Sequence, residues 1–194
     1  MSAGHTVETA KRTHAVLEVR TLSESTVALR LERKGLAFEP GQYINLGFPG
    51  GMHMREYSIY SAPDDEALEV LLKVVGGGLL SPQLGRVVPG SRLRVDGPFG
   101  SFVIPPDERR GKKLFVSTGT GIAPFRSFVR AYPDLDYCVI HGARRLEERY
   151  DWHEYAPERR LACISGEPGG DFHGRTTEWL RDELLRDRSL EEAI

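Results

Sequence analysis

Cysteine is scarce in this sequence: there are only two, Cys138 and Cys163, and both lie in apolar runs typical of strands. Two isolated cysteines in such a setting indicate buried, reduced side chains and argue against a scaffold held together by disulfides. No cysteine or histidine spacing matches a metal site, and no set of cysteines matches an iron–sulfur cluster. We therefore expect no metal centre in this chain.

Long apolar runs are also missing. No segment reaches the length of a membrane span, and the polar stretch 1–11 has no apolar core of a signal peptide. The net charge is only −2, so neither a nucleic acid nor a membrane surface is indicated as a partner. We expect a cytoplasmic, monomeric protein.

The 194 residues suffice for one large domain or two small ones, and 40% of them are hydrophobic, enough for a packed core. The character of the sequence changes near Pro105 and Pro106. We predict two domains, 1–105 and 106–194, with the charged, proline-containing stretch 105–113 as the linker.

The first half consists of short alternating or β-branched runs with turn residues between them. In 26–32, for example, Val27, Leu29 and Leu31 share one face. The predicted strands are 13–21, 26–32, 42–48, 56–61, 67–75 and 91–96. Strands of this length and spacing predict an antiparallel six-stranded barrel. One short helix interrupts them, with Ser81 as its N-cap, Pro82 as its first residue and 83–87 following.

The second half alternates strands with helices, which predicts a doubly wound parallel sheet. The predicted strands are 113–117, 137–141 and 161–165, and the predicted helices are 123–132, 147–155 and 177–186. In doubly wound folds the first strand is flanked on both sides. With only three strands, we expect a bare apolar edge along 113–117 and a domain that lacks its last strands.

One sequence run places a basic side chain, an aromatic ring and a hydroxyl on one predicted strand: Arg55-Glu56-Tyr57-Ser58. An arginine can fork onto a pyrophosphate, and a tyrosine ring can lie against a flat isoalloxazine. A serine hydroxyl can bond to the flavin N5, where hydride arrives. Taken alone, the run equally fits an exposed arginine beside a half-buried tyrosine on an ordinary strand.

The run Gly78-Leu79-Leu80-Ser81 opens the short helix of the first half. A glycine there lets the backbone approach a phosphate, which the free N–H groups of the first turn and the helix dipole attract. The alternative is a glycine-rich turn that caps a short helix. The position of this helix start after the Arg-x-Tyr-Ser strand favours a dinucleotide such as FAD over FMN.

The stretch 118–124, which contains Thr120 and Gly121, follows a strand and opens a helix, as a dinucleotide phosphate loop does. Pro124 stands where the last glycine of the full motif would be. Tight packing between the strand and the helix therefore explains this glycine turn equally well.

Arginines follow the later predicted strands: Arg144 and Arg145 come after the second and Arg175 after the third. Arginine at the carboxyl end of a strand suits the 2′-phosphate of NADP, whereas an acidic residue suits the free ribose of NAD. A solvated charged loop is the alternative, given the neighbouring Glu147 and Glu148. We interpret His141 at a strand end as structural.

In this order the motifs resemble the ferredoxin–NADP reductase superfamily, in particular the bacterial FAD-dependent ferredoxin/flavodoxin–NADP reductases. The run 55–58 is similar to the family's flavin motif, 78–81 to its pyrophosphate motif, 97–100 to the turn that closes its barrel, and 118–124 to its nicotinamide-domain loop. The resemblance implies a FAD-binding barrel followed by an NADP-binding domain.

The resemblance also implies roles for single residues. Tyr57 would stack on the flavin, Ser58 would reach N5, and Thr120 would lie near both cofactors. Two departures stand out. Bacterial members often carry Ser-Arg-Glu after the third nucleotide-domain strand, and here Gly166 replaces that arginine. The family's later Cys-Gly strand and its C-terminal segment are not present.

The expected function is electron transfer between NADPH and a one-electron carrier, ferredoxin or flavodoxin, with Ser58 and Tyr57 at the reacting centre. One alternative is an NADH-dependent reductase component of an oxygenase. Another is a FAD-binding chain with little catalytic activity. The linker contains a basic cluster, Arg109, Arg110, Lys112 and Lys113. An acidic carrier can dock on this cluster, or the cluster is simply a solvated part of the linker.

Overall fold

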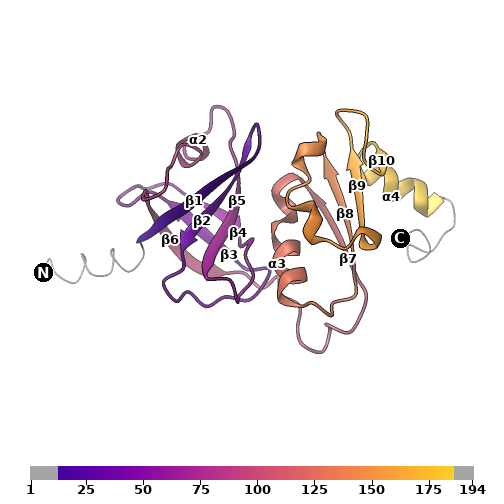
Figure 1. Ribbon diagram of the computed structural model, residues 1–194, viewed down its shortest axis with the longest axis horizontal. Coiled ribbons are helices and arrows are strands. Elements are labelled where there is room, and N and C mark those ends of the chain that lie inside the picture. The colour runs from indigo at the N-terminus through magenta and orange to yellow at the C-terminus, as the bar shows by residue number, and fades with distance from the viewer. Residues whose placement is uncertain (1–12, 186–194) are drawn as a thin grey trace, which may run out of the picture. The chain divides into compact units, whose positions relative to one another are not determined.

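The computed structural model describes residues 13–185 (Figure 1). The chain divides into two compact units, Met1–Val103 and Ile104–Ile194. Within the described part, no helix is long and apolar enough to cross a membrane.

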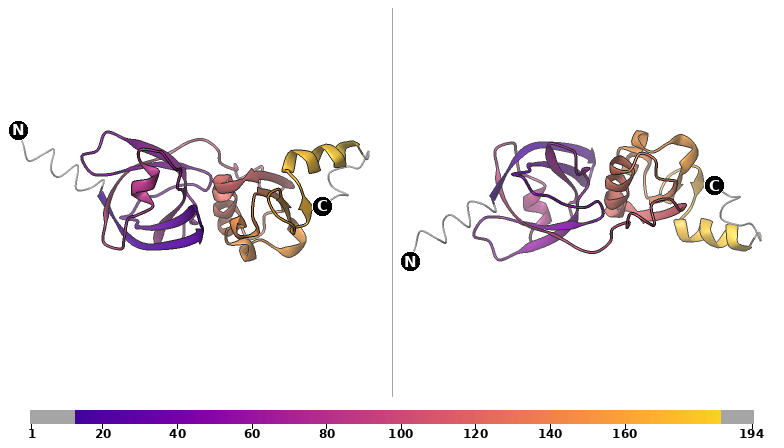
Figure 2. Two further views of the ribbon diagram at one scale, coloured as in Figure 1. Left: turned by 90° about the horizontal axis from the view of Figure 1, so that it is seen from above. Right: turned by 90° about the horizontal axis from the view of Figure 1, so that it is seen from below.

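The first unit is a six-stranded antiparallel barrel, as the sequence predicts (Figures 1 and 2). The strands follow the order β4-β3-β6-β1-β2-β5, and an isolated bridge between Ile59 and Val70 joins the two ends of this order. Closure pairs strand edges that would otherwise be open. The strands are β1 Thr13–Ser23, β2 Thr26–Glu32, β3 Tyr43–Gly47, β4 Met54–Ser58, β5 Ala67–Lys73 and β6 Arg92–Phe99.

The barrel interior is filled by aliphatic side chains from β1, β2, β3, β5 and β6, and β4 contributes Tyr57, which packs against this core. Leu29 and Leu31 of β2 are fully buried, as their alternation predicts. The short helix α2 (Ser81–Leu84) adds Leu80 and Leu84 to the same core. The glycine-rich turn before α2 is therefore anchored to the barrel by two buried leucines.

The bounds of α2 correct the sequence prediction. Ser81 is the first helical residue and Leu80 is the N-cap, and the helix ends at Leu84 instead of at Val87. The Ser81 hydroxyl accepts a hydrogen bond from the backbone N–H of Val75 (3.1 Å), so it fixes the preceding turn and does not cap the helix.

The second unit contains a parallel sheet of order β10-β9-β8-β7. Its strands are β7 Lys113–Thr118, β8 Tyr137–Ala143, β9 Arg160–Ile164 and β10 Phe172–His173, and its helices are α3 Ala123–Ala131 and α4 Thr176–Leu185. On one face, Phe115 stacks on Phe125 of α3 with ring centroids 4.6 Å apart. On the other face, Trp179 of α4 packs against Ile140 and Cys163.

The predicted doubly wound arrangement is thus confirmed, because Phe115 and Ile140 lie on opposite faces of the sheet. Phe115 pairs with Val139, and Ile140 is the next residue along the strand. In the described part of the chain β7 is an edge strand, and Leu114 and Val116 on it are 39% and 40% exposed. The last residue of the predicted helix 177–186, Arg186, lies outside the described residues.

Two predictions for this unit are wrong. The stretch 147–155 is not one helix but parts of two 3₁₀ turns, η2 (Leu146–Glu148) and η3 (Trp152–Glu154), and a third, η4 (Pro157–Arg159), follows. Asp151 between the first two has a left-handed backbone (φ 46°), which interrupts any continuous helix. The sequence analysis also missed β10, since two residues carry no periodicity.

Both cysteines are buried and free, as predicted. Burial raises the pKa of the Cys138 thiol to about 11 and that of Cys163 to about 12, so both are protonated, inert core side chains. Among residues 13–185, no group of three histidine, cysteine or acidic side chains is placed to hold a metal ion.

The stretch 105–113 is held onto the second unit at defined points. The Arg109 guanidinium lies 4.1 Å from the centre of the Tyr132 ring and donates to the carbonyl of Ile104 (3.2 Å). Lys113 Nζ donates to the carbonyls of Glu108 (2.6 Å) and Gly111 (3.1 Å). Two of the four residues of the basic cluster therefore have structural contacts, which weakens its interpretation as a docking surface.

Candidate functional site

A pocket of about 380 Å³ opens on the barrel where β4, the end of β5 and the start of α2 meet. This volume is within the range of pockets that hold organic cofactors. The bridge between Ile59 and Val70 brings these segments together by closing the barrel. The lining residues are Arg55, Glu56, Tyr57, Lys73, Val75, Gly78, Leu79, Leu80 and Ser81.

Seven of these nine residues are ones that the sequence singled out, and they come from two motifs more than 20 residues apart in the chain. Arg55 and Tyr57 lie on the same side of β4, with alternate residues sharing a face. Tyr57 packs against the barrel core, whereas Arg55 is exposed. Burial raises the pKa of the Tyr57 phenol, and the Arg55 charge nearby opposes this, so Tyr57 is a neutral ring.

The glycine-rich turn forms the opposite wall. The N–H of Gly78 donates to the carbonyl of Val75 (3.0 Å), and Gly77 has a left-handed backbone (φ 78°). A side chain at Gly78 would come within 3.1 Å of the Val75 carbonyl and 3.2 Å of the Ser81 hydroxyl. The backbone N–H of Ser81, at the first helical position, has no acceptor within its own helix.

Two lining residues were missed by the sequence analysis: Lys73 and Val75. Both lie just before the glycine-rich turn, and closure of the barrel places this end of β5 beside β4. Val75 and Leu79 are 56% and 67% exposed, so both present aliphatic surface at the pocket.

These residues fit a flavin dinucleotide. Cationic side chains of Arg55 and Lys73 and a helix start face one pocket, which suits a pyrophosphate. The Tyr57 ring and the exposed Val75 and Leu79 offer apolar surface to a flat ring system. Ser58 is not among the residues that line this pocket.

In the second unit, the loop that contains Thr120 and Gly121 is a 3₁₀ turn, η1 (Gly119–Ile122), between β7 and α3. Gly119 has a left-handed backbone (φ 52°), and Pro124 lies in the first turn of α3, where its missing N–H has no cost. A side chain at Gly142 would lie 3.0 Å from Thr176 and 3.1 Å from Thr118. The start of α4 thus lies beside the carboxyl ends of β7 and β8.

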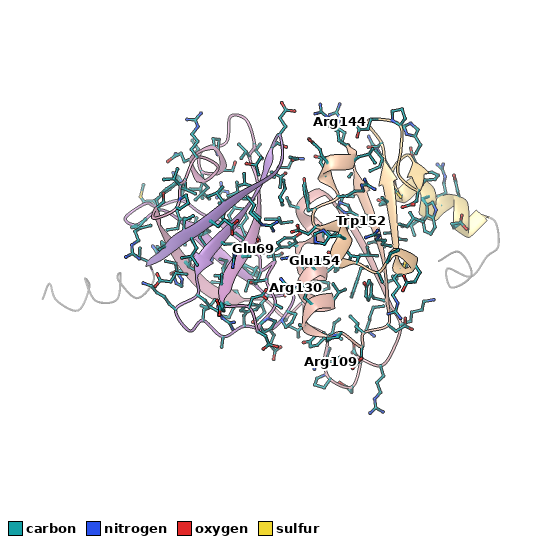
Figure 3. The ribbon with its side chains drawn as sticks, in the orientation of Figure 1. Glu69, Arg109, Arg130, Arg144, Trp152 and Glu154 are labelled. Carbon is teal, nitrogen blue, oxygen red and sulfur yellow. The ribbon has the colours of Figure 1, made fainter. Side chains whose placement is uncertain are left out.

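The loop after β8 carries Arg144 and Arg145, both exposed; Arg144 is labelled in Figure 3. Its backbone is bonded to the loop after β9: the N–H of Gly166 donates to the carbonyl of Arg144 (2.9 Å). A side chain at Gly166 would lie 2.5 Å from Cγ of Arg144 and 2.6 Å from its carbonyl oxygen. Glycine at this position therefore makes room for Arg144. Arg175, also exposed, directly precedes α4.

His141 is structural, as expected, and fully buried. Its Nε2 lies 3.1 Å from the carbonyl of Glu148, which can only accept, so Nε2 carries the proton. Its Nδ1 then accepts from the hydroxyl of Ser117 at 2.9 Å. Burial lowers the pKa of His141 to about 4, while the Glu148 carbonyl and carboxylate partly oppose this shift.

This depressed pKa predicts a loss of stability in acid. In the unfolded chain the histidine gains a proton near pH 6.5, but in the fold only near pH 4. Stability therefore falls as the pH decreases from 6.5 to 4, by about 3 kcal/mol from this group. Urea unfolding at pH 7.5 and 4.5 should show a smaller decrease for His141→Gln than for the wild type. His153→Gln, at an exposed histidine, should behave as wild type, and identical pH dependence in all three proteins would contradict the assignment.

A buried ion pair that no sequence pattern indicated fixes the segment after β8 onto α3. Arg126 is 5% exposed and donates to both carboxylate oxygens of Glu154 at 2.7 Å. Arg130, one turn further along α3, lies 3.6 Å from the same carboxylate (Figure 3). Because the two partners are far apart in sequence, only the tertiary fold reveals them.

Comparisons with known proteins agree with this geometry. Residues 14–104 match the family described as oxidoreductase FAD-binding domain. The chain is 31% identical to the reductase subunit of an aromatic O-demethylase from Amycolatopsis sp. over 84% of this chain and 54% of that protein. It is 43% identical to ferredoxin–NADP reductase B of Sorangium cellulosum over 60% of this chain and 50% of that protein.

A solved structure of a ferredoxin NADP⁺ reductase from Neisseria gonorrhoeae has the same fold, with a TM-score of 0.76 and 21% identity over 90% of this chain and 77% of that one. The chain spans about half the length of the two relatives above.

Proposed function

Because the chain belongs to the ferredoxin–NADP reductase superfamily, we propose that it is a FAD-dependent oxidoreductase that transfers electrons between NADPH and a one-electron carrier, ferredoxin or flavodoxin. The observation that carries the proposal is the barrel pocket, in which Arg55, Tyr57 and the turn 78–81 meet. These are the groups that a pyrophosphate and an isoalloxazine need, and they meet although they are distant in sequence.

Each lining residue has a distinct task in this proposal. Arg55 and the amides at the start of α2 hold the pyrophosphate, and the neutral ring of Tyr57 lies against the isoalloxazine. Bound FAD supplies the redox chemistry, since it takes two electrons from a nicotinamide and releases them singly. Ser58, the last residue of β4, keeps its proposed role of orienting the reacting centre, and Glu56 borders the same pocket.

The second unit binds the nicotinamide dinucleotide in this proposal. Thr120 and Gly121 contribute the phosphate loop, and Arg144, Arg145 and Arg175 are the candidates for the 2′-phosphate of NADP. Two acidic residues at this edge, Glu148 and Glu167, are engaged with backbone N–H groups, which supports NADP over NAD, whose free ribose an acidic residue suits. Glu148 accepts from Arg144 (2.8 Å) and Arg145 (3.1 Å), and Glu167 accepts from Leu146 (2.7 Å).

A second candidate is an NADH-dependent reductase component of an oxygenase. Gly166 favours it, since the arginine that often grips the 2′-phosphate in bacterial members is replaced there. The similarity to the reductase subunit of an aromatic O-demethylase supports the role of a reductase component.

One experiment separates the candidates. The purified full chain, saturated with FAD, is mixed without oxygen with NADPH or NADH, and bleaching of the visible flavin band is followed. The first proposal predicts that NADPH reduces the flavin at least about tenfold faster than NADH does. A tenfold preference corresponds to about 1.4 kcal/mol of interaction with the 2′-phosphate. Faster reduction by NADH supports the second candidate. If neither nucleotide bleaches the flavin band, the chain binds FAD without reductase activity, and both candidate functions are contradicted.

A further inference from the structure

We propose that Glu148 is a positioning residue: it holds the backbone of the loop 144–148 in the one conformation that presents Arg144 to the 2′-phosphate of a nicotinamide dinucleotide. The inference rests on the proposed function, because it assigns the phosphate to this loop. Glu148 itself touches no ligand in this account. It acts on Arg144 through the main chain.

The first support is the hydrogen bonding of the Glu148 carboxylate. The side chain is buried, with the residue only 8% exposed, and its Oε2 accepts from the N–H groups of both Arg144 and Arg145. The N–H of Glu148 donates back to the carbonyl of Arg145 (3.1 Å). A buried carboxylate that accepts two adjacent amides fixes the backbone between them, and leaving those amides unpaired is costly.

The second support is the anchoring of Glu148 itself. Its carbonyl accepts from the buried His141, which in turn accepts from Ser117 on the neighbouring strand. His141 and Ser117 are opposite each other in the register of β7 and β8. The chain of hydrogen bonds therefore connects the arginine loop to the adjacent strands β7 and β8, and none of its three side chains is exposed.

The third support is on the opposite side of the loop. Gly166 donates its N–H to the Arg144 carbonyl, and Glu167 accepts from the N–H of Leu146. Backbone groups from 144 to 148 are thus bonded on both sides. The Arg144 guanidinium, by contrast, is exposed, and the structure gives it no hydrogen-bond or ion-pair partner among residues 13–185. A rigid backbone that carries an exposed guanidinium is the arrangement expected of a pre-organised anion contact.

The test measures nucleotide binding, not turnover. Adenosine 2′-monophosphate, with adenosine 5′-monophosphate as the comparison, is titrated calorimetrically into the FAD-loaded full chain of the wild type, Glu148→Ala and Glu148→Gln. We expect Glu148→Ala to weaken binding of the 2′-phosphate at least about tenfold and to change that of the 5′-phosphate much less. Glu148→Gln keeps an acceptor oxygen and the side-chain volume, so its loss should be intermediate. Glu147→Ala, at the exposed neighbour, is the matched control and should bind as the wild type does.

A double-mutant cycle with Arg144→Ala decides whether Glu148 acts through Arg144. The inference predicts that Glu148→Ala has almost no further effect in the Arg144→Ala background. An equal loss in both backgrounds, or equal loss of the two nucleotides, would show a general structural role and overturn the inference. A wild type that does not prefer the 2′-phosphate would overturn the nucleotide assignment of the proposed function itself. Thermal unfolding of each variant, followed by circular dichroism and compared with that of the wild type, reports that the second unit, which carries the substitutions, is folded.

Discussion

Replacing Arg55 by alanine should weaken the binding of FAD about tenfold or more, because it removes a charge-assisted hydrogen bond to phosphate, typically about 1.5–3 kcal/mol. The barrel should remain intact. Arg55 is exposed, and its side chain donates a hydrogen bond to the carbonyl of the adjacent Met54 (3.1 Å). Titration of the cofactor-free chain with FAD, followed by flavin fluorescence, gives the dissociation constant.

Two further variants make this result specific. Arg55→Lys keeps the charge but loses the planar fork, so its affinity should lie between those of wild type and Arg55→Ala. Arg30→Ala removes an arginine on the barrel surface, where it pairs with Glu18 at 2.8 Å, and should bind FAD as the wild type does. An Arg55→Ala variant with wild-type affinity would remove Arg55 from the site.

Installing arginine at Gly166 should weaken the binding of 2′-phosphorylated nucleotides, although it restores the residue that bacterial members often carry. The new Cβ would lie 2.5 Å from Cγ of Arg144 and 2.6 Å from its carbonyl oxygen. Since backbone does not yield as a flexible side-chain end does, the Arg144 loop must move. Forced overpacking of this kind typically costs about 1–3 kcal/mol, which corresponds to a loss of affinity of about fivefold to 150-fold if the loop bears the whole cost.

Calorimetric titration of Gly166→Arg with adenosine 2′-monophosphate measures this loss. Gly166→Ala is the matched variant, because it adds the same Cβ without a guanidinium, and it should lose affinity as well. The prediction is contradicted if Gly166→Arg binds adenosine 2′-monophosphate more tightly than the wild type and Gly166→Ala loses no affinity. The loop would then accommodate a side chain at position 166, and the glycine would merely lack the arginine that binds the phosphate.

Much of this fold could be predicted, because its elements are local patterns. β2 begins and ends where the alternation of Val27, Leu29 and Leu31 predicts, and the apolar strand β7 is followed by a glycine turn as expected. The wrong elements depend on single backbone conformations or on neighbours. The left-handed Asp151 interrupts a helix-like sequence, and β10 exists only because β9 is beside it.

The site shows the same division. The chemistry of Arg55 and Tyr57 is visible in the sequence, but Lys73 and Val75 enter the pocket only through barrel closure. The hydrogen bonds from Glu148 to the arginine loop, and the space that Gly166 leaves for Arg144, are also tertiary features. In the sequence, Glu148 is one of several charged residues in a polar run, and Gly166 is noticed only because bacterial members often have an arginine at that position.

The central claim is that the barrel holds FAD, and the absorption spectrum of the purified chain tests it most directly, together with identification of the chromophore released on denaturation. We expect the visible bands of an oxidised flavin and a released chromophore that is FAD and not FMN. A colourless protein that takes up no added flavin nucleotide would contradict the claim.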